Sequence, residues 1–238
     1  MIPRFIRHRD KALQPRKNIL VYKHTRMYVC GQEVMFQVAR KTKEEAKETR
    51  EAIINAAIDV FYEHGVSKGS LEEIAEAAGV TRGAVYWHFK NKAAIFSAIH
   101  DEFHTSVMEG FITQADNSID PVHDLKEFSG NFLKLLQEDE RHKKILSLFS
   151  LKCDYSGEMA EFLDEQRLKK MESMKQLEKF FALAQKKGQI EKDRTTELLA
   201  VSFFCYMCGI STESLRHPTI VSLTKNGPEL IDMFFKKL

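Results

Sequence analysis

Two pairs of residues in this chain have types and spacings that could support chemistry. His100 and His104 lie four residues apart, which would place two imidazoles on one face of a helix, as in many metal-ligand pairs. The zincin motif needs a glutamate directly after its first histidine, and Asp101 occupies that position here. The competing interpretation is a histidine pair that is partly exposed or lines a pocket.

Cys205 and Cys208 form the second pair, a Cys-x-x-Cys sequence inside an apolar run with helical spacing. No strand pattern precedes it, as a thioredoxin-like redox motif would require. The sequence therefore favours a packed interface helix, with redox sensing as the alternative. With Cys30 and Cys153 the chain has four cysteines, too few for a disulfide framework at this length, which indicates a reducing cytoplasm.

Patterns that are typical of enzymes are missing from the sequence. It contains no Glu-x-x-His pair of the di-metal helical bundles, no Gly-x-Ser-x-Gly, no His-Glu-x-x-His and no glycine-rich phosphate loop. We therefore predict a protein that is not an enzyme and that needs neither a cofactor nor a metal. No run of 18 apolar residues occurs, which predicts a soluble protein with no membrane partner.

The segment from Ser70 to Phe89 has the residue spacing of a helix-turn-helix. Ala75 is small at the position where the two helices would cross, and Gly79 permits the tight turn between them. Residues 77–100 contain three basic residues and no acid, so that a basic patch would lie where DNA would bind. The apolar seam and core of the motif would consist of Ile74, Val80, Val85 and Phe89.

The segment Gly-Val-Thr-Arg-Gly-Ala-Val-Tyr-Trp-His-Phe-Lys-Asn-Lys, residues 79–92, resembles the TetR family, and especially its AcrR-like branch of multidrug-efflux repressors. The match is strong from about Val38 to Phe103 and weak afterwards. The resemblance implies a three-helix DNA-binding head, a C-terminal helical ligand-binding domain, and a homodimer made by the last two helices. It also implies a repressor that a small hydrophobic or cationic inducer releases from a palindromic operator in double-stranded DNA.

The side chains of the motif indicate how it would contact DNA. Arg82 is the candidate for a base contact, because a guanidinium can bind guanine O6 and N7 through two hydrogen bonds. Gly83 would let the backbone approach the groove, or would only let two helices cross. Thr81 and Trp87 are expected to contact phosphate, although Thr81 could merely cap its helix and Trp87 could pack against the first helix. The predicted DNA-binding set is Ser70, Thr81, Arg82, Gly83, Ala84, Tyr86, Trp87, His88, Lys90 and Lys92.

Capping residues and apolar spacing predict an all-α fold of about nine helices. After the first helix at 43–64 and the two short helices of the motif, the expected ranges are 92–111, 121–138, 141–153, 156–187 and 193–216, and a last helix that follows Asn226-Gly227-Pro228. The expected domains are a helix-turn-helix domain at 38–92 and a ligand-binding and dimerisation domain at 93–238.

Residues 1–37 show no sustained periodicity and carry eight basic and two acidic residues, a net charge of +6 against +2 for the whole chain. We expect this basic extension to be disordered or absent from the native protein, because Val38-Ala-Arg-Lys-Thr-Lys resembles the start of AcrR-like repressors and a GTG start codon would encode that valine. The alternative is a basic arm that grips DNA.

The helix at 92–111 would start beside DNA and continue into the C-terminal bundle, as the only element that touches both. A mainly apolar pocket against its far half could therefore transmit ligand binding to the head. The predicted lining is Phe103, His104, Val107, Phe111, Phe128, Phe132, Phe149 and Cys153. Two alternatives remain open: a metal- or redox-responsive regulator that uses one of the two residue pairs above, and a helical adaptor that binds no DNA.

Overall fold

The computed structural model describes residues 28–29, 32–33, 43–112 and 118–236. It divides the chain into two compact units, 1–45 and 46–238, and each is described by itself. In the first unit, strands β1 (Tyr28–Val29) and β2 (Gln32–Glu33) form an antiparallel pair, with Tyr28 opposite Glu33. Apart from these two short strands, the predictions for residues 1–37 lie outside the described residues.

In the described part of the second unit every regular element is a helix, which confirms the all-α class. A three-helix head, α1 (Lys43–His64), α2 (Leu71–Ala77) and α3 (Arg82–His88), leads into the long helix α4 (Lys92–Ile112). Local chemistry fixes the start of α4, where the side chain of Asn91 accepts a hydrogen bond from the backbone N–H of Ala94 at 2.9 Å.

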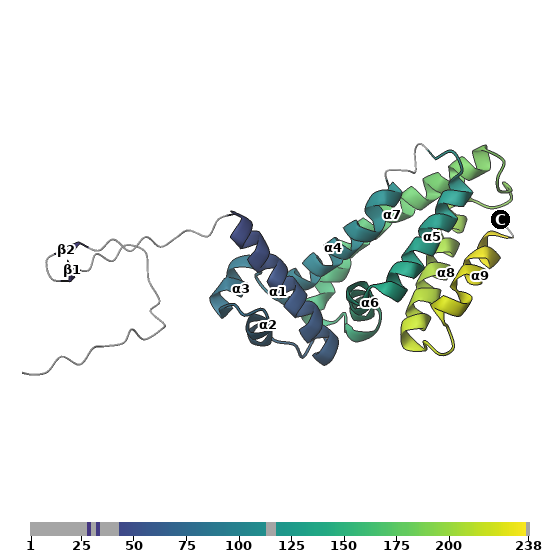
Figure 1. Cartoon of the computed structure of the whole chain (residues 1–238). Coiled ribbons are helices and arrows are strands. Elements are labelled where there is room, and N and C mark those ends of the chain that lie inside the picture. Colours follow the sequence, from purple (N-terminus) through teal and green to yellow (C-terminus); the bar gives the residue numbers. More distant parts are fainter. Residues whose placement is uncertain (1–27, 30–31, 34–42, 113–117, 237–238) are drawn as a thin grey trace, which may run out of the picture. The chain divides into compact units, whose positions relative to one another are not determined.

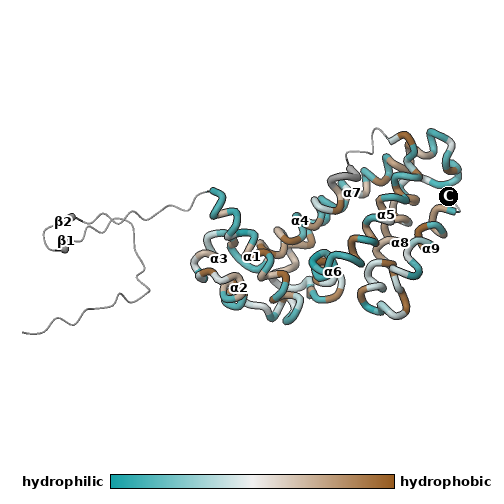
Figure 2. The backbone as a smooth tube through the Cα atoms, in the orientation of Figure 1, coloured by the Kyte–Doolittle hydropathy of each residue, from teal (hydrophilic) through white to brown (hydrophobic). Residues whose placement is uncertain are grey.

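The remaining helices form a C-terminal bundle (Figure 1). They are α5 (Pro121–Glu138), α6 (Glu140–Ser147), α7 (Ala160–Lys186), α8 (Thr196–Arg216) and α9 (Leu223–Phe235). A wider helical turn, Leu148–Lys152, follows α6, and a single 3₁₀ turn, Gly157–Met159, precedes α7. Helix α8 packs along α7, and α9 packs along α5. Figure 2 shows apolar and polar residues interspersed along these helices, as expected where one face of a helix is buried.

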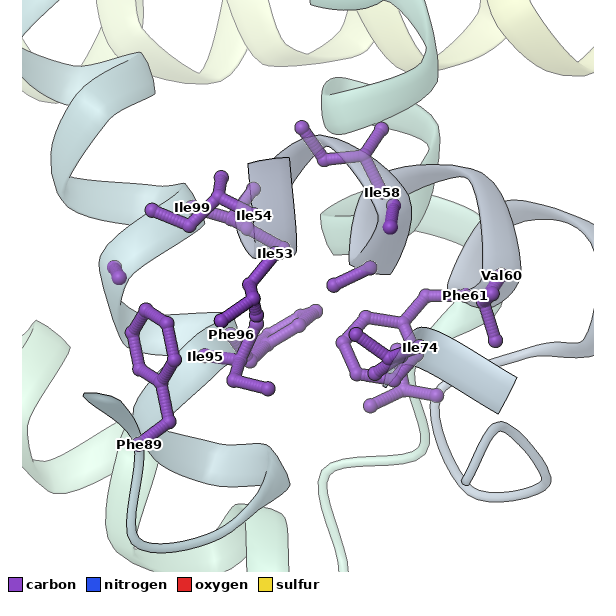
Figure 3. Close-up of a cluster of buried hydrophobic side chains, with 14 of the residues drawn as sticks. Ile53, Ile54, Ile58, Val60, Phe61, Ile74, Phe89, Ile95, Phe96 and Ile99 are labelled. Carbon is purple, nitrogen blue, oxygen red and sulfur yellow. The ribbon is translucent and has the colours of Figure 1, made fainter. Parts of the chain in front are cut away.

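Two apolar cores hold the second unit together. The first lies in the head, where Figure 3 shows the isoleucines of α1 gathered with Ile95, Phe96 and Ile99 of α4. Ile53, Phe61 and Phe96 have no exposed surface. The second core lies in the C-terminal bundle and is built from α5, α7, α8 and α9, with Phe180 and Phe181 fully buried.

The head core also includes side chains from beyond α4. The buried cluster that contains α1 also includes Ile145 of α6 and Leu148 of the turn after it, and Met159 of the 3₁₀ turn and Phe162 of α7. Polar contacts add to this attachment, because Lys144 on α6 pairs with Asp59 on α1 at 2.6 Å. The prediction that the helix at 92–111 is the only link between head and bundle is therefore wrong, since α6 and α7 touch the head as well.

The start of the last helix also differs from the sequence-based prediction. Helix α9 begins at Leu223, because the hydroxyl of Ser222 caps it by accepting a hydrogen bond from the backbone N–H of Lys225. Pro228 lies inside the helix instead of before it. Gly227 is buried, and a Cβ atom added there would lie 3.6 Å from Leu133 on α5. The Asn-Gly-Pro sequence is thus a place of close helix packing and not a turn.

Candidate DNA-binding surface and ligand cavity

The helix-turn-helix is built from local capping interactions. At the start of α2, the Ser70 side chain accepts a hydrogen bond from the backbone N–H of Glu73, and the Glu73 carboxylate accepts one from the backbone N–H of Ser70. At the start of α3, the Thr81 hydroxyl accepts from the backbone N–H of Ala84 at 3.2 Å. Gly79 lies between the helices with φ +65°, which favours glycine. Ser70 and Thr81 thus have structural roles that are independent of DNA.

One face of α3 is buried and the other is exposed. Val85 and Phe89 belong to the head core, as predicted, with 0% and 5% of their surface exposed. On the opposite face Tyr86 is 47% exposed and Trp87 is 73% exposed. The structure therefore does not pack Trp87 against α1, and an indole this exposed is available for another molecule.

Arg82 occupies the first turn of α3 and is held by neighbouring side chains. Its guanidinium forms an ion pair with Glu72 on α2 at 2.6 Å and donates a hydrogen bond to the Tyr86 hydroxyl at 3.3 Å. The Tyr86 hydroxyl and the Glu72 carboxylate raise the pKa of Arg82, so that it stays charged. To contact a base, Arg82 would have to break its ion pair with Glu72 and bind DNA instead.

The other predicted DNA-binding residues lie around the same surface. Gly83 and Lys90 are exposed, and Ala84 and His88 are partly buried. Lys92 differs from the prediction in its detail, because its ammonium donates hydrogen bonds to the backbone carbonyls of Val66 and Ser67 at 3.3 and 2.9 Å. It stabilises the connection after α1, which is a structural role in addition to the predicted contact with DNA.

A cavity of about 680 Å³ lies in the C-terminal bundle. Most of its wall is apolar and comes from five parts of the chain: α4, α5, the end of α6 with the following turn, α7 and α8. Six of the eight residues that the sequence predicted line it: Phe103, His104, Val107, Phe128, Phe132 and Phe149. The side chain of Phe111 lies outside the described residues. Cys153 is absent from the lining and packs partly buried against the head core, so we do not retain it in the proposed set.

Sequence reasoning missed two walls of the cavity. Helix α8 contributes Phe203, Phe204 and Met207, and α7 contributes a stripe of residues with helical spacing: Phe162, Gln166, Lys169, Lys170, Ser173 and Leu177. The polar members of this stripe interrupt an apolar face, and that pattern was readable from the sequence. Which side of α8 faces inward depends on packing against α7, which the sequence does not encode locally.

The wall formed by α4 and α7 carries most of the polar groups of the cavity. The His104 Nε2 lies 3.0 Å from the Ser173 hydroxyl. Burial lowers the pKa of His100 to about 4, and burial also lowers the pKa of His104. Both imidazoles are therefore uncharged at neutral pH.

An aromatic cluster joins the cavity to the head core. Phe149 and Phe162 line the cavity, and each packs edge-on against Phe96 of α4, with ring centroids 5.0 and 4.8 Å apart. Phe96 in turn packs edge-on against Phe61 of α1 at 6.5 Å. Contacts of this kind pass continuously from the cavity wall to the first helix of the head.

The two residue pairs noted at the outset lie apart from any cluster of metal ligands. The rings of His100 and His104 stack with centroids 6.2 Å apart, and among the described residues no group of three or more histidine, cysteine, aspartate or glutamate side chains could hold a metal ion. Cys205 and Cys208 are free thiols on α8, both with exposed surface.

Comparisons with known proteins agree with this geometry. A family model described as "Bacterial regulatory proteins, tetR family" matches residues 53–99, and one described as "MAATS-type transcriptional repressor, C-terminal region" matches residues 120–238. The HTH-type transcriptional regulator AcrR of Shigella flexneri is 35% identical over 195 residues, which cover 82% of this chain and 91% of AcrR. The chain belongs to the TetR family. It is a DNA-binding transcriptional regulator, and its predicted resemblance to AcrR is confirmed.

Solved structures of TetR-family repressors have the same fold. NalD, the secondary repressor of the MexAB-OprM multidrug efflux pump in Pseudomonas aeruginosa, superposes with a TM-score of 0.74 at 29% identity, covering 82% of this chain and 97% of NalD. SmeT of Stenotrophomonas maltophilia, solved as a complex with triclosan, has a TM-score of 0.72 at 31% identity, covering 79% of this chain and 90% of SmeT.

In this TetR-family regulator, α8 exposes apolar side chains along one face. Leu198 and Val201 are 53% and 44% exposed, and the exposed Cys205 and Cys208 lie farther along the helix. By length and composition α8 is the one described helix that could cross a membrane, yet it packs along α7, and 33% of its most apolar stretch is buried in the chain. Exposed apolar side chains that follow one another along a helix face are typical of a protein interface.

Proposed function

We propose that this regulator is a homodimeric repressor of a multidrug efflux operon, and that it leaves its operator when a small hydrophobic molecule fills the cavity in the C-terminal bundle. The observation that carries the proposal is that Phe149 and Phe162 belong both to the cavity wall and to the packing around Phe96 in the head. NalD and SmeT, which share the fold, repress multidrug efflux pumps.

The DNA-bound form would be a dimer acting in the cytoplasm on a palindromic operator. The exposed apolar face of α8, one of the last two helices, supports a dimer interface there. In such a dimer the two α3 helices would enter major grooves about 34 Å apart, or at a related spacing that matches the operator. Arg82 would read a base edge, while the backbone around Gly83 and the side chains of Tyr86, Trp87 and Lys90 would fix the register.

Release would follow from two conformations that differ in the spacing of the heads. A ligand that pushes on Phe149 and Phe162 displaces groups that also pack against Phe96, so that it favours one arrangement of the head over the other. A differential affinity worth about 1 to 3 kcal/mol would shift operator binding by roughly 5- to 150-fold, which is enough for derepression.

The test of this function combines operator binding with a blocked cavity. Val107 lines the cavity from α4, and its replacement by tryptophan should fill the cavity while leaving α3 unchanged. We expect Val107→Trp to bind DNA upstream of its own gene as the wild type does, and to resist release by triclosan and other apolar antimicrobials in a mobility-shift assay.

A matched control is available two residues away. Thr105 is exposed on the outer face of α4 and does not line the cavity, so Thr105→Trp adds the same side chain without filling the site. This variant should release DNA as the wild type does. If Val107→Trp releases DNA at the same inducer concentration as Thr105→Trp, the inducer binds elsewhere.

A further inference from the structure

The cavity contains a buried amide without a hydrogen-bond partner. Gln166 lines the cavity from α7, and neither its side-chain oxygen nor its side-chain nitrogen has a partner among the described residues, although both atoms are buried. The Nδ1 atom of His100 on α4 is likewise buried without a hydrogen bond, with the Asp101 carboxylate 3.8 Å away. Leaving such groups unpaired is unfavourable, so a ligand that forms hydrogen bonds with them gains affinity.

The amide requires a particular complement. One atom accepts a hydrogen bond and the adjacent atom donates one, so the matching ligand group offers a donor and an acceptor side by side. A phenol does this with one hydroxyl, and a carboxylate, the form that a carboxylic acid takes at pH 7, accepts a hydrogen bond from the amide N–H. A quaternary ammonium group does neither.

The charges on the cavity wall favour the same class. All four charged residues of the lining belong to one stretch of α7, and three of them are basic: Asp164, Arg167, Lys169 and Lys170. Lys169 contacts Asp101 of α4, and the Lys170 ammonium lies 4.3 Å from the centre of the Phe204 ring. Helices α5, α6 and α8 contribute no charged side chain to the lining. An excess of positive charge stabilises an oxygen anion and disfavours a permanent cation.

The two histidines of the lining do not change this net charge. His100 and His104 are neutral at pH 7 because burial lowers the pKa of each. The cavity therefore combines mainly apolar walls on α5, α8 and the turn after α6 with a wall on α4 and α7 that carries all of its charged side chains and most of its hydrogen-bonding groups.

We propose that the cavity binds bulky aromatic compounds whose polar end is an oxygen acid, a phenol or a carboxylic acid, with that end directed at Gln166 and His100. This inference rests on the proposed function, because it names the class of inducer for the same cavity. It departs from the sequence-based expectation of cationic inducers, since that expectation did not include the basic stretch of α7.

Four ligands with the same aromatic body test the proposal. Biphenyl-4-carboxylic acid, biphenyl-4-ol, biphenyl-4-yl-trimethylammonium and unsubstituted biphenyl differ only in the polar end. Isothermal titration calorimetry on the full chain at pH 7 measures each affinity without DNA. We expect both oxygen acids to bind at least tenfold more tightly than the ammonium compound, a ratio that corresponds to about 1.4 kcal/mol and lies within the range of one hydrogen bond.

Variants of α7 assign this preference to the residues named. Gln166→Leu should weaken the two oxygen acids by about tenfold and leave biphenyl unchanged. Gln166→Glu should reverse the order and favour the ammonium compound, because it places a carboxylate on the polar wall. Lys170→Gln should weaken the carboxylic acid, whereas Lys175→Gln, which removes an exposed lysine of α7 outside the lining, should not.

Two results would overturn the proposal. One is an ammonium compound that binds the wild type as tightly as the acids, and the other is a Gln166→Leu variant that loses affinity for all four ligands equally. Either result leaves operator binding and its release by apolar antimicrobials, the proposed function, to be judged separately from the Val107→Trp assay.

Discussion

The arginine at the start of α3 has intramolecular partners that DNA would have to replace. Arg82 is paired with Glu72 and bonded to the Tyr86 hydroxyl in the DNA-free chain. Because the pair with Glu72 is exposed on both sides, it contributes little to folding and is readily exchanged. Its use is to keep the guanidinium near the position from which it would reach a groove.

Removing this guanidinium should weaken both affinity and selectivity. We expect Arg82→Ala to cost about 1 to 3 kcal/mol of operator affinity and to relax the preference at one base pair in each half-site. Binding to an operator set with single-base changes measures both effects. Glu72→Gln removes the ion pair and keeps the arginine, so it should retain selectivity. Unchanged affinity and selectivity in Arg82→Ala would mean that another residue reads the base.

His100 should make the stability of the fold depend on pH. Its folded-state pKa is about 4 because burial disfavours the charged form, whereas an unfolded histidine has a pKa of about 6.5. The unfolded chain thus binds the proton more readily, and stability is lost as the pH falls from about 6.5 to about 4. The loss from this residue is at most about 3 kcal/mol.

Thermal unfolding at several pH values measures this effect. The Tm of the wild type should fall over that interval, and His100→Gln, which cannot be protonated, should show a shallower fall. An equally steep fall in both proteins would assign the pH dependence to other groups.

At the scale of elements, two glycines near the motif have different reasons to be glycine. A Cβ atom on Gly69, between α1 and α2, would lie 2.9 Å from Phe61 and 3.2 Å from Val60, which are both buried. On Gly83, inside α3, the nearest atom would be 3.9 Å away. Nothing in the described head therefore requires a glycine at position 83. This argues against the interpretation that Gly83 lets two helices cross, and it favours the interpretation that the backbone at Gly83 lies close to DNA.

The matching alanine variants should separate folding from DNA binding. Gly69→Ala should lower the free energy of unfolding by about 1 to 3 kcal/mol, because Phe61 has no room to move. Gly83→Ala should keep or raise the Tm, since alanine favours a helix by up to about 1 kcal/mol, and should weaken operator binding. Denaturant unfolding and mobility shifts on both variants provide the comparison, and full operator affinity in Gly83→Ala would rule out a close backbone contact.

Elements whose ends carry their own chemistry were predictable from the sequence. Ser70, Thr81, Asn91 and Asp120 each accept a hydrogen bond from a backbone N–H at a helix start, and each indicates that start by residue type alone. The start of α9 was not predictable in this way, because the turn signal at Gly227 competes with the cap at Ser222 and close packing against Leu133 decides between them.

The predicted sites also differ in how far the local sequence determines them. The motif at 70–89 is local in sequence, so its exposed and buried faces follow from helical spacing. The cavity is assembled from five separate parts of the chain, and the share that α8 contributes depends on which of its faces packs against α7. The contact of α6 with α1 is similarly non-local, since Lys144 and Asp59 are 85 residues apart.

At the scale of the whole molecule, the exposed face of α8 predicts the state of assembly. Val201→Glu places a charge among exposed apolar residues, which should dissociate the proposed dimer and weaken operator binding through the loss of the second head. Light scattering coupled to size-exclusion chromatography measures the mass. Ile119→Glu is a suitable control, because Ile119 is 86% exposed just before α5. A Val201→Glu variant that keeps a dimeric mass would place the interface elsewhere.

The buried cluster that α1 shares with Ile145, Leu148, Met159 and Phe162 limits how such regulators can be recombined. A chimera that joined the head of one family member to the sensor of another at residues 92 and 93 would pair two halves of a core that were selected separately. The side chains from the two proteins would not fit together at the buried contact between head and sensor, through which the ligand signal passes. Biosensor designs on this scaffold should therefore transplant α6 and the start of α7 together with the head, or redesign those four residues to fit the new partner.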